Sequence, residues 1–363
     1  MRIGITCYPT FGGSGVLASE LGRELARKHD VHFICYAQPF RLEGSDIPFH
    51  KVSVLAYPLF KFPPYTLALA SKMLEVVQEE DLELLHVHYA IPHSTSAYLA
   101  KNLLQNRIKV VTTLHGTDVQ LVGLDPSYKS VTKFSIEQSD GVTAVSNFLK
   151  NLTVQEFSIE KDIRVIYNFV DCSRYRTEPH EGNIITHVSN FRELKRIPDV
   201  IDIFCKISAL VPAKLYLVGD GPEIPLAEEL VRKCNLEDRT TFFGNIRAVE
   251  DILAKTDIFL LPSELESFGL AALEAMASSV PVIASNVGGL PEVIDHEENG
   301  FLCELRDTEK MAEYAVELLR DESLKKEIGR RAREKVEKFF SSEIVVPEYE
   351  KYYKEILESQ NPI

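Results

Sequence analysis

The chain of 363 residues carries a formal net charge of −14 and is 45% hydrophobic and 26% charged, the composition of an ordinary globular protein. This length predicts two domains rather than one core, and the acidic balance argues against nucleic acid or an anionic membrane as a partner. The six cysteines form no CxxC pair, and no apolar run approaches the length of a membrane span, so we expect a cytoplasmic protein with no stable membrane association.

Short apolar, β-branched runs alternate with longer amphipathic segments along the whole chain. This alternation is typical of βα units that build parallel sheets. In the first half, strands are expected over residues 3–7, 31–36, 84–88, 110–114 and 141–145. In the second half, strands are expected over residues 184–189, 214–219, 240–243, 258–261, 280–284 and 300–303. The predicted fold class is therefore α/β, with two doubly wound, Rossmann-like domains that face a central cleft.

The boundary between these domains is expected in the segment 165–175. The first domain then comprises residues 1–168 and the second comprises residues 169–344. Beyond them the chain is charged and helical, and Pro347 suits the start of a last helix. This C-terminal helix, within 345–363, is expected to pack back on the first domain.

A glycine-rich loop, Gly12-Gly-Ser-Gly15, follows the first predicted strand and opens a helix. Free amide groups at a helix start, together with the helix dipole, suit a phosphate. The loop lacks the GxGxxG spacing of a dinucleotide-binding turn, and no acidic residue is placed to bind a dinucleotide ribose, which argues against NAD. Glycine-rich turns of this kind also occur without any ligand, so a phosphate site and a purely structural turn are both open at this point.

Two glutamates, Glu266 and Glu274, follow the apolar strand 258–261 across a strand-to-helix turn. If the helix begins near Phe268, Glu266 lies in the loop at the carboxyl end of the strand and Glu274 lies on the helix. Open α/β sheets bind ligands at this end of their strands. Carboxylates accept hydrogen bonds from sugar and ribose hydroxyls, and amides at the helix start suit a diphosphate. A solvated loop glutamate and a solvated helix glutamate are the alternative that these residues leave open.

The spacing of Glu266 and Glu274 is the Glu-x7-Glu motif of the retaining glycosyltransferases of GT-B family 4, which the chain resembles over nearly its whole length. Further stretches agree with that family in order and spacing: Gly12-Gly-Ser-Gly15, His115-Gly-Thr-Asp118, Asn168 with Val170-Asp171, Val218-Gly-Asp-Gly-Pro-Glu223 and Asn286-Val-Gly-Gly-Leu-Pro-Glu292. The resemblance implies a GT-B architecture, with the acceptor bound in the first domain and a UDP-sugar in the second.

The resemblance also implies roles for single residues. Glu274 would bind the nucleotide ribose, Glu266 and the amides after it would hold the transferred sugar, and Lys195 would neutralise the diphosphate. The family usually has an arginine shortly before this lysine, where this chain has Asn190, and Arg192 is the candidate to supply the missing charge. The predicted catalytic residues are Lys195, Glu266 and His115. The predicted donor-binding residues are Gly13, Gly15, Asn190, Arg192, Lys195, Glu266, Phe268, Gly269, Leu270 and Glu274.

Within the family, the stretches 7–15, 86–93 and 188–196 are most similar to enzymes that transfer N-acetylglucosamine from UDP-N-acetylglucosamine to L-malate, the first step of bacillithiol biosynthesis. These enzymes resemble a mycothiol-pathway transferase that uses inositol phosphate, which implies an anionic acceptor. A dicarboxylate needs hydroxyls, amides and a cation. The predicted acceptor-binding residues are Ser14, Lys61, Tyr89 and Thr113. Taken singly, Tyr89 and Lys61 are equally consistent with a core tyrosine and a solvated loop lysine.

Four histidines, His86, His88, His93 and His115, raise the question of a metal. The first three straddle a predicted strand and its turn, and His86 and His88 face one way without an evident carboxylate partner, so no metal site is predicted. His115 ends a strand, and the family places this histidine beside the donor sugar, although a capping or core role is also open. No cofactor is predicted besides the co-substrate UDP-N-acetylglucosamine.

The family resemblance implies retention of configuration by a same-face displacement, in which the departing phosphate takes the acceptor proton. The enzyme then supplies positioning and charge stabilisation. An aromatic stretch from Tyr57 to Tyr65 would favour a lipid or polysaccharide acceptor instead. A UDP-sugar 2-epimerase shares the architecture, but the Glu-x7-Glu motif argues against it. Similar enzymes suggest a homodimer.

Overall fold

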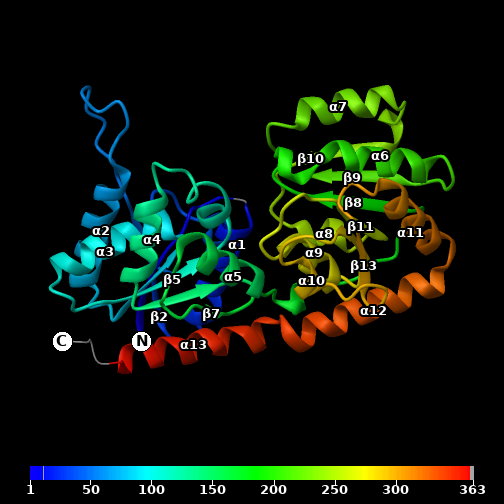
Figure 1. The fold of residues 1–363 in the computed structure, drawn as a ribbon. Helices are drawn as coiled ribbons and strands as arrows, with labels where there is room; N and C mark the ends of the chain where they lie inside the picture. Colours follow the sequence, from blue (N-terminus) through cyan, green and yellow to red (C-terminus); the bar gives the residue numbers. More distant parts are fainter. Residues whose placement is uncertain (11, 360–363) are drawn as a thin grey trace. The chain divides into compact units, whose positions relative to one another are not determined.

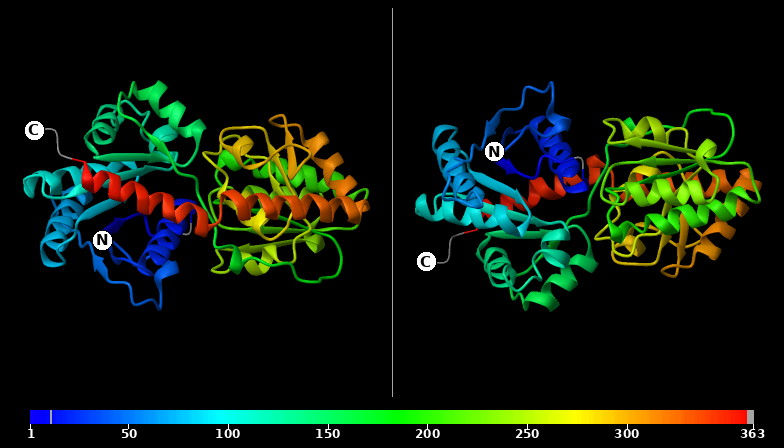
Figure 2. Two further views of the ribbon diagram at one scale, coloured as in Figure 1. Left: turned by 90° about the horizontal axis from the view of Figure 1, so that it is seen from below. Right: turned by 90° about the horizontal axis from the view of Figure 1, so that it is seen from above.

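The computed structural model describes residues 1–10 and 12–359. Its chain divides into two compact units (Figure 1). Unit 1 comprises Met1–Tyr167 and Val345–Ile363, and unit 2 comprises Asn168–Ile344. Each unit is built on one parallel sheet with helices on both faces (Figure 2). The predicted α/β, doubly wound fold class is confirmed.

Unit 1 contains a seven-stranded sheet with the order β3-β2-β1-β4-β5-β6-β7. Its strands are β1 (Arg2–Thr6), β2 (Asp30–Cys35), β3 (Phe49–Lys51), β4 (Leu84–His88), β5 (Lys109–Leu114), β6 (Gly141–Ala144) and β7 (Arg164–Val165). Its longer helices are α1 (Gly13–Ala26), α2 (Tyr65–Glu79), α3 (Thr95–Leu103), α4 (Lys129–Gln138) and α5 (Asn147–Phe157). Strand order reverses between β1 and β4, so the loops after these strands lie at a topological switch point, where such sheets bind ligands.

Strand β4 shows how the two faces of this sheet are filled. Leu85 and Val87 join an apolar cluster with Met73 of α2. Alternate residues of a strand point to opposite faces, and His86 lies against the last helix, α13 (Ser342–Glu358), where the Tyr353 hydroxyl is 2.7 Å from His86 Nδ1. The final helix therefore supplies part of the interior of unit 1.

Unit 2 contains a six-stranded sheet with the order β10-β9-β8-β11-β12-β13. Its strands are β8 (Ile184–Val188), β9 (Lys214–Val218), β10 (Thr240–Gly244), β11 (Ile258–Leu261), β12 (Val282–Ser285) and β13 (Gly300–Cys303). Its helices are α6 (Ile197–Ser208), α7 (Ile224–Lys233), α8 (Val249–Leu253), α9 (Leu270–Ala277), α10 (Leu290–Val293), α11 (Thr308–Arg320) and α12 (Glu322–Phe339). The switch point of this sheet lies between β8 and β11.

Two strands and the start of the last helix of unit 1 differ from the sequence expectations. Strands β3 and β7 were not expected. They are short and lie at the two edges of the sheet of unit 1. An edge strand has a neighbouring strand on one side only, so it needs no long apolar run.

Helix α13 begins at Ser342 and contains Pro347 inside it, rather than starting at Pro347. The ring removes one helix hydrogen bond, but Tyr349 and Tyr353 are fully buried on the same helix and hold it in place. Residues 360–363 lie outside the described residues.

In the described part of the chain, none of the helices combines the length and the apolar character that a membrane span requires.

Candidate active site

The two loops at the switch point of unit 2 carry Lys195 and Glu266. Lys195 follows β8 and Glu266 follows β11. Lys195 Nζ lies 2.5 Å from Glu266 Oε1, and the Ser263 hydroxyl donates to the same oxygen at 2.8 Å. The amide of Glu264 donates to the Leu194 carbonyl at 2.8 Å and ties the loops together. The two charged side chains are only 21% and 12% exposed, so removing either would leave a poorly hydrated charge.

Two glycine-rich stretches fix the backbone of these loops. The Gly289 amide donates to the Glu266 carbonyl at 2.9 Å, and a Cβ on Gly288 would lie 1.9 Å from that carbonyl oxygen. On the other loop, a Cβ on Gly221 would lie 2.0 Å from the Asn190 carbonyl oxygen. The glycine motifs shared with the family therefore let neighbouring backbones approach the loops that carry the candidate residues.

Helix α9 begins at Leu270, slightly later than the expected start near Phe268. Gly269 is its N-cap with φ of 100°, a left-handed conformation that favours glycine. No side chain caps this helix, so its first amides have no partner within the helix and suit an anion. Phe268 is 2% exposed, and its buried ring anchors the loop just before these amides.

Glu274 lies on α9 and is 8% exposed. The Tyr175 hydroxyl donates to Glu274 Oε1 at 3.2 Å. Burial, and after it the negative charge of Glu274, raises the pKa of Tyr175, so this hydroxyl stays protonated and orients the carboxylate. Tyr175 is a site residue that was not predicted, because it belongs to the expected linker and no sequence motif connects it with Glu274.

Two further candidates for a diphosphate, Asn190 and Arg192, lie exposed in the loop after β8. Arg192 makes no ion pair with the described residues. Arg196, by contrast, is held by both carboxylate oxygens of Asp199, at 2.5 and 2.9 Å, and by Glu264 at 3.3 Å. Of the arginines beside Lys195, Arg192 is thus the one whose charge is available to an anion.

The glycine loop of unit 1 opens α1 at Gly13, with Gly12 as N-cap and no side-chain cap. Gly13 is exposed, whereas Gly15 is buried. The Gly15 amide donates to the Gly12 carbonyl at 3.1 Å, and a Cβ on Gly15 would lie 2.5 Å from the Tyr8 carbonyl oxygen. Gly15 is therefore required by packing, whereas the amides of Gly13 and Ser14 have no partner within the helix, an arrangement that suits an anion.

The loops after β1 and β4 meet through Ser14 and Tyr89. Their hydroxyl oxygens are 2.7 Å apart. Tyr89 has φ of 93°, which is strained for a residue other than glycine and is typical of functional sites. Burial raises the pKa of Tyr89 to about 12, so its phenol remains a hydrogen-bond donor at neutral pH. The structure brings together these two of the four predicted acceptor residues.

The other two predicted acceptor residues lie elsewhere. Thr113 is fully buried in β5, and its hydroxyl is 2.7 Å from both His86 Nε2 and the Thr143 hydroxyl. It therefore supports the sheet beneath the switch point rather than facing solvent. Lys61 is exposed in the loop after β3, with its ammonium 5.5 Å from the centre of the Phe62 ring.

His115 follows β5 and contacts the same switch point. Its Nε2 lies 2.8 Å from His88 Nδ1, and its ring centre lies 5.4 Å from that of Tyr89. Burial lowers the pKa of His115 to about 3, so the ring is neutral and acts through hydrogen bonds.

Asp118 connects the loops that follow β4 and β5. It accepts hydrogen bonds from the Ala90 and Gly116 amides, both at 2.9 Å. Asp118 belongs to a motif already noted, but its positioning role was not predicted.

Two doubly wound units, with a glutamate pair and a lysine at the switch point of the second, define a GT-B glycosyltransferase. The chain belongs to this family: residues 11–174 match the model "Glycosyltransferase Family 4", and residues 173–335 match "Glycosyl transferases group 1". It is 50% identical to N-acetyl-alpha-D-glucosaminyl L-malate synthase of Bacillus anthracis, over 98% of this chain and 97% of that protein. The predicted family and the predicted sugar-transferring activity are confirmed.

Solved structures agree on the fold. A glycosyltransferase from Rickettsia africae superposes with a TM-score of 0.80 at 23% identity and covers 99% of each chain. Anabaena HepE, in complex with UDP and glucose, superposes with a TM-score of 0.80 at 20% identity, over 99% of this chain and 100% of that one.

Proposed function

We propose that this glycosyltransferase moves N-acetylglucosamine from UDP-N-acetylglucosamine to the hydroxyl group of L-malate with retention of configuration, as the first step of bacillithiol biosynthesis. The observation that carries the proposal is 50% identity, along 98% of the chain, to a relative named for N-acetylglucosaminyl malate synthesis. At this level of identity over the full length, the acceptor is best sought among small dicarboxylates.

The donor residues of the proposal lie in unit 2. Glu274, oriented by Tyr175, accepts hydrogen bonds from the ribose, and Glu266 accepts them from the sugar. An ammonium has three N–H donors, so Lys195 can keep its contact with Glu266 while it donates to the diphosphate. As the bond to the sugar breaks, negative charge grows on the departing phosphate, and a fixed cation in a poorly hydrated loop stabilises that charge. Arg192 and the first amides of α9 help to stabilise the same negative charge.

The acceptor residues of the proposal lie in unit 1. One of the Ser14 and Tyr89 hydroxyls donates to the other, and the hydroxyl that accepts this bond donates its own proton to a malate carboxylate. The first amides of α1 bind an anionic group of the substrates. His115 lies against Tyr89 and, being neutral, donates or accepts a hydrogen bond without adding charge beside the sugar. Lys61 remains the predicted cation for the second carboxylate, and Thr113 acts indirectly by fixing His86.

The test is UDP release by the purified protein from UDP-N-acetylglucosamine, with L-malate, with inositol phosphate and without acceptor. We expect release that depends on malate, with the glucosaminyl malate product identified by mass spectrometry. UDP release without any acceptor, or UDP release only with inositol phosphate, would refute the malate assignment. A malate-dependent signal also excludes a UDP-sugar 2-epimerase, which needs no acceptor.

A lipid acceptor is a second candidate, favoured by one surface feature. Tyr57, Phe60 and Phe62 are 50%, 48% and 80% exposed in the loop between β3 and α2, whereas Tyr65 is partly buried. Exposed aromatic clusters mark contact surfaces. Sedimentation with anionic liposomes separates the two candidates, because a malate-specific enzyme stays in the supernatant.

We also propose that the chain forms a homodimer. One chain has a mass of 41.0 kDa, so light scattering coupled to size exclusion distinguishes a monomer from twice that mass. A monomer across the working concentration range would exclude the dimer.

A further inference from the structure

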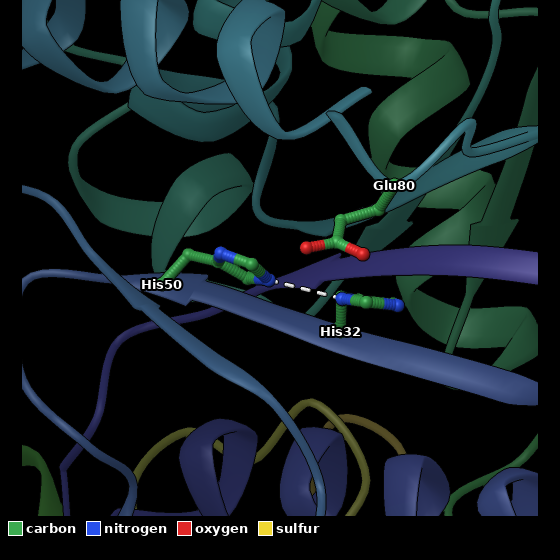
Figure 3. Close-up of side chains that lie close together, drawn as sticks. All are labelled: His32, His50 and Glu80. Atoms are coloured by element: carbon green, nitrogen blue, oxygen red, sulfur yellow. Dashed lines mark hydrogen bonds between the residues drawn. The ribbon is translucent and has the colours of Figure 1, made fainter. Parts of the chain in front are cut away.

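Three side chains converge at one edge of the sheet of unit 1 (Figure 3). His32 lies on β2, His50 lies on the neighbouring edge strand β3, and Glu80 is the C-cap of α2. One possible ligand atom from each lies within 4.8 Å of the other two. His32 Nδ1 and His50 Nε2 are 2.9 Å apart, and Figure 3 shows the Glu80 carboxylate pointing toward these two nitrogens. None of these residues belongs to the candidate active site.

The separations fit a shared metal ion. Four-coordinate zinc binds histidine nitrogen and carboxylate oxygen at about 2.0 to 2.2 Å, which places neighbouring ligand atoms about 3.3 Å apart. The observed distances, 2.9 Å between the nitrogens and at most 4.8 Å within the group, bracket that value. Small side-chain rotations therefore complete the geometry. Within residues 1–10 and 12–359, the Glu80 carboxylate makes no hydrogen bond and no ion pair, so it is not committed to another partner.

Asp30 lies beside the outer nitrogen of His32. His32 is 3% exposed, and Asp30 Oδ1 lies 3.2 Å from its Nε2, although this nitrogen makes no hydrogen bond with the described residues. The nearby negative charge favours a proton on Nε2 and leaves Nδ1 to bind a metal. Nδ1 is the nitrogen that faces His50.

We propose that His32, His50 and Glu80 form a binding site for a divalent transition metal ion, with zinc as the expected ion and water in the fourth position. Two imidazoles and one carboxylate are a zinc ligand set, whereas magnesium and calcium prefer oxygen ligands. The ion joins the short edge strand β3 to β2 and to the end of α2. Its role is to stabilise this corner of unit 1, next to the loop that carries Lys61.

The test is titration of the metal-free full chain with cobalt(II) and zinc(II). We expect one tight site per chain, with the visible absorption of tetrahedral cobalt, and displacement of cobalt by zinc. His50→Ala and Glu80→Gln should each weaken binding at least about 10-fold. The matched control is His296→Ala, which removes an exposed histidine 3.6 Å from Glu297 and should leave binding unchanged.

Thermal unfolding supplies a readout that does not depend on enzyme activity. His50 and Glu80 are partly exposed, so their variants should fold without metal, as circular dichroism would show. Zinc should raise the melting temperature of the wild-type chain and of His296→Ala, but not of His50→Ala. Equal zinc affinity in the wild type, His50→Ala and Glu80→Gln would overturn the proposal, as would a wild-type chain with no site beyond weak surface binding. Loss of the malate-dependent activity is not needed for either result.

Discussion

Glu274→Gln tests the placement of the nucleotide ribose in unit 2. The change keeps the size of a side chain that is 8% exposed, and the amide oxygen still accepts the hydrogen bond of Tyr175. Only the charge is lost. Hydrogen bonds to charged groups contribute about 1.5 to 3 kcal/mol and neutral ones about 0.5 to 1.5 kcal/mol, so one ribose bond should weaken by about 1 to 1.5 kcal/mol. At about 1.4 kcal/mol per tenfold change, UDP affinity should fall about 5- to 10-fold.

Isothermal titration with UDP measures this loss directly. Glu274→Ala removes the acceptor altogether and should cost about 1.5 to 3 kcal/mol, or about 10- to 100-fold in affinity. Tyr175→Phe keeps the Glu274 carboxylate but removes the hydrogen bond that orients it. Its effect on UDP affinity should therefore be smaller than that of Glu274→Ala. If Glu274→Gln and Glu274→Ala are folded and bind UDP as tightly as the wild type does, the ribose is not at Glu274 and the reasoning fails.

Three further predictions concern the lysine, the glycine loop and a buried histidine. Lys195→Ala should lower malate-dependent UDP release by about 100-fold or more, with partial recovery in Lys195→Arg; unchanged turnover would contradict its role. Gly15→Ala should lower stability by about 1 to 3 kcal/mol in thermal unfolding, since its Cβ would lie 2.5 Å from the Tyr8 carbonyl oxygen; an unaltered melting temperature would show that the turn can relax. Burial lowers the pKa of His187 to about 4, so below about pH 6.5 the unfolded chain binds a proton that the folded chain does not. His187 should therefore contribute a fall in stability of about 1.4 kcal/mol per pH unit from pH 6.5 toward pH 4, besides the falls from the other buried histidines. The slope in urea unfolding should be shallower for His187→Gln, and equal slopes would exclude a contribution from this residue.

In unit 1, the inner strands could be predicted from the sequence more accurately than the two edge strands. Strands β4 and β11 lie inside their sheets and occupy the expected residues. Strand β11 is a continuous apolar run with clear ends, as expected of a strand buried on both faces. The edge strand β13 of unit 2 was also predicted, because three of its four residues are buried. Strands β3 and β7 lie at sheet edges, and neither contains a fully buried residue, so no such run marks them. The predicted start of α13 was wrong, because a proline such as Pro347 normally lies in the first turn of a helix. Here the burial of the helix's tyrosines contributes more stability than the lost hydrogen bond costs.

The candidate site was predictable as a set of loops but not as a set of contacts. Glu266 and Lys195 were identified by family motifs, yet their 2.5 Å ion pair joins segments far apart in the chain. Tyr175 and Asp118 act by orienting other groups, and no spacing rule reports a partner that lies on another loop. Thr113 was expected at the acceptor because it lies near the end of a strand, but the alternation of β5 turns its hydroxyl to the buried face beside His86.

Helix α13 makes the first unit depend on a segment that is synthesised after the second unit. Tyr349 and Tyr353 are fully buried, and the Tyr353 hydroxyl lies 2.7 Å from Nδ1 of His86, a residue of the central strand β4. During translation, unit 1 would therefore leave the ribosome with this face of its sheet uncovered, while unit 2 has all of its strands before the final helix emerges. The order of folding on the ribosome should thus be the reverse of the order of synthesis: unit 2 completes first, and unit 1 closes only after α13 has emerged.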